Sequence, residues 1–360
     1  MTHSLKVELR DLLFQGTVIP AHPLALTRER KLDEERQRAL THYYMASGAG
    51  GIAIGVHTTQ FEIRQKGIDL YEPVLRMAAE EINKAQLNRP FLKIAGIAGE
   101  TTQAISEAET AAGLGYHLGL VSMGGLTHLS ERQHLERVKA VADVLPVFGF
   151  YLQRSVGGRR FSYNFWREFC EIPGVTAIKL APFDRYCTLE VVRAVCHSSR
   201  HSDIALYTGN DDNIVADLLT EFRFSVGGEV RTKQMIGGLL GQWAVWTTKA
   251  VELLEEIKRI KDMDSIPVEM LTIGAEITDA NAALFDPGNG FKGCIAGINE
   301  VLRRQGLVRE NVCLKDTEQL SPGQMEEINR VYLQYPHLTD DDFIKENLPG
   351  WLSGVSLHSN

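Results

Sequence analysis

Residues 147–180 read VFGFYLQRSVGGRRFSYNFWREFCEIPGVTAIKL, and this stretch decides the fold class. It begins and ends with two short apolar runs, Val147–Leu152 and Val175–Leu180. The segment Tyr163–Cys170 between them has the apolar spacing that is typical of an amphipathic helix. Strands of a parallel sheet are buried on both faces, so an apolar run, a helix and a second apolar run predict two parallel strands joined by a crossover helix.

The same alternation runs through about two thirds of the chain. The predicted strands lie near Thr17–Ala21, Gly51–His57, Leu92–Ile97, Leu118–Ser122, Val147–Leu152, Val175–Leu180, Ile204–Thr208 and Met235–Gly238. The predicted helices between them are Asp33–Ser47, Tyr71–Leu87, Thr101–Ala112, Ser130–Val144, Tyr163–Cys170, Leu189–Ser198 and Asp212–Leu219. Eight strands with intervening helices favour an α/β fold of the (β/α)8 TIM barrel type over residues 1–241; a doubly wound open sheet is the alternative.

The chain changes character after Gly241. Four further amphipathic segments predict helices and no strand: Trp243–Lys261, Met270–Leu284, Lys292–Gln305 and Pro322–Gln334. No linker rich in Pro, Gly or Ser separates them from the barrel. We therefore expect residues 242–360 to form a C-terminal helical extension that packs on the barrel.

Composition and charge narrow the class of protein. The 360 residues carry a formal net charge of -8, with 38 Lys and Arg among 46 Asp and Glu, so nucleic acid is not an expected partner. The start of the chain, MTHSLKVELRDLLF, lacks the apolar core of a secretory signal, and the longest uncharged stretch, His42–Phe61, holds four glycines. Five cysteines without a CxxC pair indicate a reducing compartment. The sequence predicts a cytoplasmic protein with no membrane partner.

Lys179 stands in the apolar run Val175–Leu180, where an aliphatic residue is expected. It is either a strand-end lysine whose amine reaches water, or an amine desolvated until its pKa falls far enough to make it a Schiff-base nucleophile. Tyr151 falls near the end of the preceding strand, so adjacent strands are expected to put the two side chains together. A phenol there can relay the protons of amine–carbonyl condensation, or it can simply be a core aromatic.

Three further segments follow predicted strands. Gly55-Val56-His57-Thr58-Thr59-Gln60 offers hydroxyl and backbone N–H donors to a carboxylate, or it is an ordinary helix cap. The segments beginning at Gly209 and containing Gly238 allow backbone to approach a ligand, or they are turns.

Together these features resemble the superfamily of dihydrodipicolinate synthase and N-acetylneuraminate lyase, class I lyases that form a Schiff base. The resemblance covers roughly residues 14–335 and rests on Thr17-Val18-Ile19-Pro20, the Thr-Thr turn, the Gly96–Thr102 segment, the strand tyrosine, the Ile-Lys pair and Gly-Asn-Asp-Asp after the seventh strand. Its most specific element is the separation of 28 residues between Tyr151 and Lys179 (179 minus 151).

The resemblance implies that Lys179 forms an imine with a pyruvate-like 2-oxo acid, that Tyr151 relays protons and that the turn holds the carboxylate. It also implies substrate contacts from Gly209 and Gly238, no cofactor, and a homo-oligomer. A gapless alignment puts His57 and Thr58 on the family's Thr-Thr pair, so that His57 takes over proton delivery; a shift by one residue matches Thr58 and Thr59 instead.

Two departures argue against authentic dihydrodipicolinate synthase activity. The segment Val121–Gly125 lacks the tyrosine that those enzymes use there, and Val156 stands where they have an arginine for the second substrate's carboxylate. Arg154 or Arg159 could serve a shifted acidic substrate, but both also fit a solvated loop. The expected activity is that of a carbon–carbon or carbon–oxygen lyase, by aldol cleavage, condensation or dehydration. The second substrate would be an aldehyde or a sugar acid.

Two other classes stay open. A metal-dependent lyase or hydrolase would use the ligands His22, His57, Glu100, Asp211 and Asp212, although none forms a recognised ligand motif and no metal is expected. A paralogue that binds a metabolite without catalysis is the other.

Overall fold

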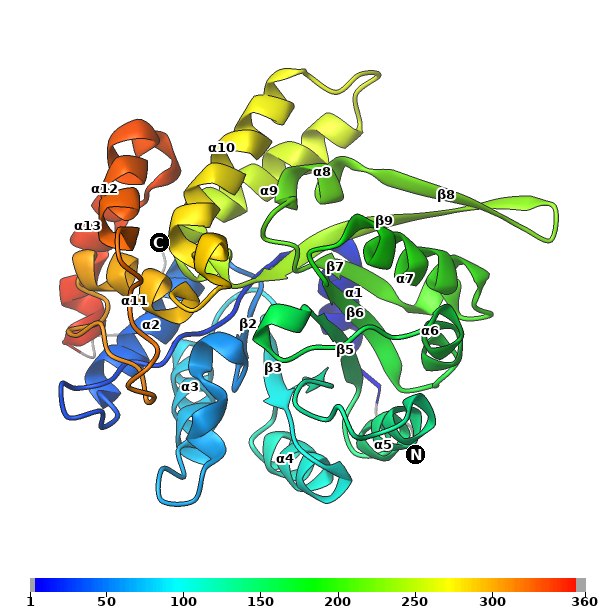
Figure 1. Ribbon diagram of the computed structural model, residues 1–360, viewed down its shortest axis with the longest axis horizontal. Helices are drawn as coiled ribbons and strands as arrows, with labels where there is room; N and C mark the ends of the chain where they lie inside the picture. The colour runs from blue at the N-terminus through cyan, green and yellow to red at the C-terminus, as the bar shows by residue number, and fades with distance from the viewer. Residues whose placement is uncertain (1–3, 354–360) are drawn as a thin grey trace. The chain divides into compact units, whose positions relative to one another are not determined.

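The computed structural model describes residues 4–353 (Figure 1). Its strands are β1 Val18–Pro20, β2 Gly51–Ile54, β3 Leu92–Ile97, β4 Leu118–Ser122, β5 Val147–Leu152, β6 Val175–Ala181, β7 Ala205–Thr208, β8 Glu221–Val226 and β9 Glu229–Leu240. The helices up to β9 are α1 Val7–Gln15, α2 Glu34–Ala46, α3 Tyr71–Ala85, α4 Thr101–Gly113, α5 Glu131–Ala142, α6 Tyr163–Cys170, α7 Arg185–His197 and α8 Ile214–Leu219. After β9 come α9 Thr247–Lys261, α10 Glu269–Phe285, α11 Cys294–Arg304, α12 Gln324–Gln334 and α13 Asp341–Leu352.

The parallel strands follow the order of a (β/α)8 barrel. The order in the sheet is β1-β9-β7-β6-β5-β4-β3-β2, and β8 pairs with β9 outside this path. A parallel bridge between Ala21 and Ala53 links the ends of β1 and β2, the first and last strands of that order. The predicted TIM barrel with C-terminal helices is therefore confirmed, with β9 as its eighth strand.

The chain forms two compact units. Of the described residues, unit 1 comprises 4–17 and 92–239, and it carries β3 to β8 and most of β9 with helices α1 and α4 to α8. Unit 2 comprises the described residues 18–91 and 240–353 and carries β1, β2, α2, α3 and α9 to α13. The predicted domain boundary between residues 241 and 242 stays a prediction. Within the described part of the chain, no helix is long and apolar enough to cross a membrane.

Unit 1 shows why β5 and β6 have both faces apolar. Gly149 and Ile178 are partners in the β5–β6 register. A Cβ on Gly149 would lie 2.6 Å from the Phe169 ring of α6, so this helix packs directly on the strand. The opposite faces of β5 and β6 line the barrel interior, where the Phe148 ring meets Tyr207 at 5.3 Å between centroids.

Unit 2 is held together by a buried carboxylate on the loop before α13. Asp340 is 4% exposed and accepts hydrogen bonds from Tyr43 Oη (2.7 Å), Thr248 Oγ1 (2.9 Å) and Gln305 Nε2 (3.0 Å). These donors come from α2, α9 and the end of α11. Because Asp340 itself precedes α13, its side chain links four helices: α2, α9, α11 and α13. Burial raises the pKa of Asp340 above its ordinary value.

Among the boundaries that differ from the sequence-based prediction, two have a clear physical cause. β2 ends at Ile54 rather than at His57, because Gly55 adopts a φ of 76° and the chain turns into a 3₁₀ segment, His57–Thr59. Helix α7 begins at Arg185 rather than near Leu189, since the Asp184 carboxylate caps it by accepting from the Cys187 amide at 3.0 Å.

Three elements were not predicted at all: α1, α13 and the β8–β9 hairpin. β9 begins at Glu229, well before the predicted Met235, and pairs antiparallel with β8 around Gly227 and Gly228. Charged residues alternate with phenylalanines in β8, so the segment lacks the apolar run by which the barrel strands were recognised. The hairpin extends away from the other strands of unit 1 (Figure 1).

Candidate active site

A row of inward-facing residues crosses unit 1 at the level of Lys179. Direct partners in the successive strand registers are Ser122 with Phe150, Phe150 with Lys179, Lys179 with Tyr207, and Tyr207 with Gly237. Direct partners on neighbouring strands point to the same face of a sheet. The row lies near the carboxyl ends of these strands, where the functional groups of TIM barrels are found.

Lys179 is buried, with 7% of its surface exposed, and its Nζ lies 4.4 Å from the centroid of the Phe150 ring. Gly209 leaves the space that this side chain occupies. A Cβ at residue 209 would lie 2.5 Å from Lys179 Cε and 2.8 Å from Ala181 Cβ, while the Gly209 amide donates to Leu180 O at 2.7 Å. The predicted importance of Gly209 thus has a specific physical basis: only glycine fits against the lysine.

A buried polar network fixes the loop that carries Gly209. The Asp217 carboxylate accepts from Thr208 Oγ1 (2.7 Å), Asn210 Nδ2 (2.9 Å) and Asn213 Nδ2 (3.1 Å) and is paired with Arg185. Asn210 in turn accepts the Phe183 amide at 3.1 Å, which joins the loops after β6 and β7. Sequence reasoning singled out the Gly-Asn-Asp-Asp segment but missed Asp217, which had only its place in a short helix as a signal.

The structure does not bring Tyr151 to Lys179. In the β5–β6 register Tyr151 is the partner of Leu180, one residue beyond the lysine. Successive residues of a strand point to opposite faces, so Tyr151 points toward the helices, where its ring lies 4.9 Å from Trp166 of α6. The expectation that adjacent strands put the two side chains together is wrong for this register.

The Tyr151 hydroxyl lies instead beside Cys187 at the start of α7. Burial raises the pKa of Tyr151, and its hydrogen bond with the Cys187 thiol adds to the increase. Burial also raises the pKa of Cys187, which is 6% exposed. Both groups are therefore held in their neutral forms.

Gly238 and its neighbour allow β9 to pass close to residue 17. The Gly238 amide donates to Thr17 O at 3.3 Å. A Cβ on Gly237 would lie 2.5 Å from the same oxygen. In unit 1 these glycines thus serve backbone packing, and a contact of Gly238 with substrate stays a prediction.

In unit 2 the His57–Thr59 turn is bound to the segment that follows β1. Thr59 Oγ1 donates to His22 O at 2.6 Å and accepts from the Gly55 amide at 3.0 Å. Thr58 Oγ1 donates to Ala21 O at 2.8 Å. Both hydroxyl protons are therefore used by backbone carbonyls, and the half-buried His57 ring lies 6.1 Å from Phe61.

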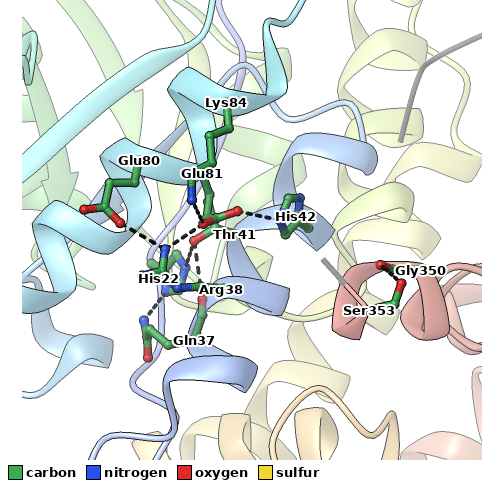
Figure 2. Close-up of polar contacts among 10 residues, drawn as sticks. All are labelled: His22, Gln37, Arg38, Thr41, His42, Glu80, Glu81, Lys84, Gly350 and Ser353. Carbon is green, nitrogen blue, oxygen red and sulfur yellow. Dashed lines mark hydrogen bonds and ion pairs between the residues drawn. The ribbon is translucent and has the colours of Figure 1, made fainter. Parts of the chain in front are cut away.

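The His22 side chain joins this segment to α2 through Gln37 and Thr41 (Figure 2). Its ring is fully buried; Nδ1 lies 2.8 Å from Pro23 O, which makes it the donor, and Nε2 lies 3.0 Å from Thr41 Oγ1. Gln37 Nε2 donates to the same Pro23 oxygen at 3.1 Å. Burial lowers the pKa of His22 to about 4, so the ring is neutral at neutral pH.

Figure 2 also shows how α2 is joined to α3. Arg38 pairs with Glu80 at 3.1 Å and with Glu81 at 2.6 Å, while His42 Nε2 lies 2.9 Å from Glu81 Oε2. Thr41, the partner of His22 Nε2, also lies on α2. The ion pairs between α2 and α3 therefore help to hold the helix to which His22 is bound. Among residues 4–353, no group of three or more His, Cys, Asp or Glu side chains is placed to hold a metal ion.

Comparisons with known proteins find one similar sequence and many similar folds. No family model matches the chain. The N-acetylneuraminate lyase of Citrobacter koseri is 25% identical over 209 residues, which is 56% of this chain and 65% of the length of that relative.

Solved structures show the fold over most of the chain. Dihydrodipicolinate synthase from Acinetobacter baumannii, solved with pyruvate, superposes with a TM-score of 0.71 at 18% identity, covering 88% of this chain and 98% of that one. The enzyme from Oceanobacillus iheyensis gives 0.69 at 17%, covering 90% and 97%. N-acetylneuraminate lyase from Fusobacterium nucleatum gives 0.68 at 15%, covering 89% and 99%.

Fold and site thus define a TIM barrel with a buried lysine near the end of its sixth strand. The chain is similar in sequence to an N-acetylneuraminate lyase and shares its fold with the solved dihydrodipicolinate synthases and N-acetylneuraminate lyases.

Proposed function

We propose that the protein is a Schiff-base-forming lyase that acts on a pyruvate-like 2-oxo acid through Lys179. The observation that carries the proposal is the placement of a buried amine on the inner face of β6, in space left by Gly209. Attack on a keto carbon requires the neutral amine of a lysine. In the reaction, Nζ forms a bond to the keto carbon and the keto oxygen leaves as water.

The inner-face row also suggests a proton carrier. Ser122 is 5% exposed and occupies the same row as Lys179, two strands away, which places the two Cα atoms about 10 Å apart. Condensation needs a proton at the departing oxygen. Ser122 is therefore proposed as a relay in place of Tyr151, whose ring lies on the helix-facing side of β5.

The turn in unit 2 is proposed as the carboxylate-binding element. The Thr58 and Thr59 hydroxyl protons are donated to backbone carbonyls, and the Thr59 amide donates to Val56 O at 3.1 Å. The Thr58 amide is therefore the proposed donor for an anion. His57 is proposed to deliver protons to the bound intermediate. Gly238 completes the proposed substrate contacts.

The test is covalent trapping with borohydride. Pyruvate with the wild-type protein should give, after reduction, an adduct with the mass of pyruvic acid less one oxygen, mapped by peptide mass to Lys179. Lys179→Ala should abolish the adduct. The matched control is Lys93→Ala, because Lys93 is also buried, at 6% exposed, but lies at the amino end of β3. An adduct on another lysine refutes the assignment.

The same experiment separates the alternatives. A metal-dependent lyase would give turnover without trapping and would lose it on chelation. A metabolite-binding paralogue would bind a 2-oxo acid without adduct or turnover. A panel of aldehydes and sugar acids, added after imine formation is established, then identifies the second substrate.

A further inference from the structure

The β8–β9 hairpin is larger than the barrel needs. Only Met235, Gly237 and Gly238 of β9 pair with β7, whereas β9 begins at Glu229 and is preceded by all of β8. Two contacts of β9 hold the hairpin: Arg231 donates to Cys196 O at 2.8 Å and Lys233 to His201 O at 2.5 Å. It is therefore a fixed ribbon that the barrel does not require.

The outer edge of β8 carries backbone groups with a definite pattern. Gly227 and Gly228 have φ values of 60° and 90°, as a two-residue type I′ loop demands, and Val226 and Glu229 flank it. The flanking pair of such a loop exchanges both backbone hydrogen bonds, and every second pair along the ladder does the same. The backbone groups of Glu221, Arg223 and Ser225 consequently point to the outer edge.

Within residues 4–353 the sheet places no strand on that edge, since β8 pairs with β9 alone. The three side chains at these positions, Glu221, Arg223 and Ser225, are all exposed on one face of the ribbon. Val230, the partner of Ser225, is 68% exposed on the same face. An open edge of this kind is a template for another strand.

We propose that the occupant is the β8 strand of a second copy, paired antiparallel across a twofold axis. Residues that point outward must face each other, and three registers pair at least two of the three outward positions on each strand. Centring on Arg223 sets two arginines against each other, and centring on Phe224 pairs Arg223 with Ser225. Centring on Phe222 pairs each Glu221 with the partner's Arg223, so charge complementarity selects this register.

The selected register joins the two hairpins into one four-stranded sheet. Each Arg223 forms an ion pair with Glu221 of its own strand, with Nε 2.8 Å from Oε1. In the dimer it gains a second ion pair with Glu221 of the other copy. Phe222 meets the partner's Phe222 at the axis, in a pair where the side chains approach closely. This interface goes beyond the proposed lyase activity and does not depend on it.

The first experiment measures mass in solution by sedimentation equilibrium. Wild-type protein at micromolar concentration should have twice the protomer mass. Arg223→Glu and Glu221→Arg should each weaken the dimer about tenfold or more, while the double variant Glu221→Arg/Arg223→Glu restores it. Arg132→Glu, at an exposed ion pair on α5, is the control that should leave the mass unchanged. A monomeric wild type, harmless single reversals or a double variant that stays weak each overturns the proposal.

The second experiment tests the register. An equimolar mixture of Glu221→Cys and Arg223→Cys proteins should form a disulfide-linked heterodimer on mild oxidation, because these positions are direct partners. Each variant alone should not link to itself, and the five native cysteines are buried. The register is contradicted if Arg223→Cys cross-links to itself. It is also contradicted if no cross-link forms in the mixture or in either single variant.

Discussion

Acidification should destabilise the protein through His22, and the size of the effect follows from the burial of its ring. The pKa of His22 is lowered from 6.5 to about 4 in the folded protein, chiefly by burial. Between these values the unfolded chain binds a proton that the folded chain does not, so stability falls as pH falls. The contribution is complete above the unfolded pKa of 6.5 and is lost as pH approaches about 4.

The magnitude comes from the difference in pKa. The change in the pKa from 6.5 to about 4 corresponds to about 3 kcal/mol in the free energy of unfolding, of which about 2 kcal/mol is lost by about pH 5. His22→Gln and His22→Asn remove the titrating ring and keep a polar side chain. Each should be less stable than wild type at about pH 7.5, and the difference should shrink by about 2 kcal/mol at about pH 5.

Urea unfolding followed by tryptophan fluorescence is the assay, since Trp243, Trp246 and Trp351 lie with His22 in unit 2. His117 and His134, whose pKa values are also lowered to about 4, remain in every variant and cancel in the comparison. If the difference between wild type and variants is the same at both pH values, the His22 ring is not desolvated as its burial implies.

Three further predictions concern unit 1. Gly209→Ala should slow imine trapping about a hundredfold, because the added Cβ displaces the Lys179 side chain. The control Gly113→Ala should leave the rate unchanged, since a Cβ at residue 113 has no atom within 4 Å; equal rates for the two variants would refute the close contact. Ser122→Ala should slow trapping more than Tyr151→Phe does, since only Ser122 shares the inner face; the reverse order would show that Tyr151 reaches the lysine. Asp217→Asn should lower the free energy of unfolding by about 2 to 4 kcal/mol in urea titrations, because the Arg185 charge loses its partner, and an unchanged midpoint would contradict that.

The barrel strands could be predicted because each is a short apolar run bounded by turn residues. Burial on both faces leaves no other composition for a barrel strand, so sequence and structure agree at β3, β4 and β5 to the residue. The same argument singled out Lys179, since a charged residue is conspicuous in such a run.

The hairpin escaped prediction for the converse reason. A solvent-exposed ribbon needs no apolar run, and β8 alternates Phe222 and Phe224 with Glu221 and Arg223. The signal that could have found it is the Gly227-Gly228 pair between two alternating segments, a pattern typical of a tight hairpin. The hydrogen-bond network around Asp217 could not be predicted from the sequence, because its members come together only when the loops after β6 and β7 are folded.

The placement of Tyr151 shows how a spacing can match while the geometry does not. Val147 pairs with Val175, a separation of 28 residues, but Phe148 pairs with Ala177, a separation of 29, because the register shifts by one residue at this point. The extra residue in β6 is Thr176, whose hydroxyl donates to Val147 O at 3.2 Å. Without the shift, a separation of 28 would make Tyr151 the partner of Lys179. A separation in the sequence includes unpaired residues, whereas the strand register depends only on the residues that pair. One unpaired residue is therefore enough to move a side chain from the barrel interior to the helix-facing side.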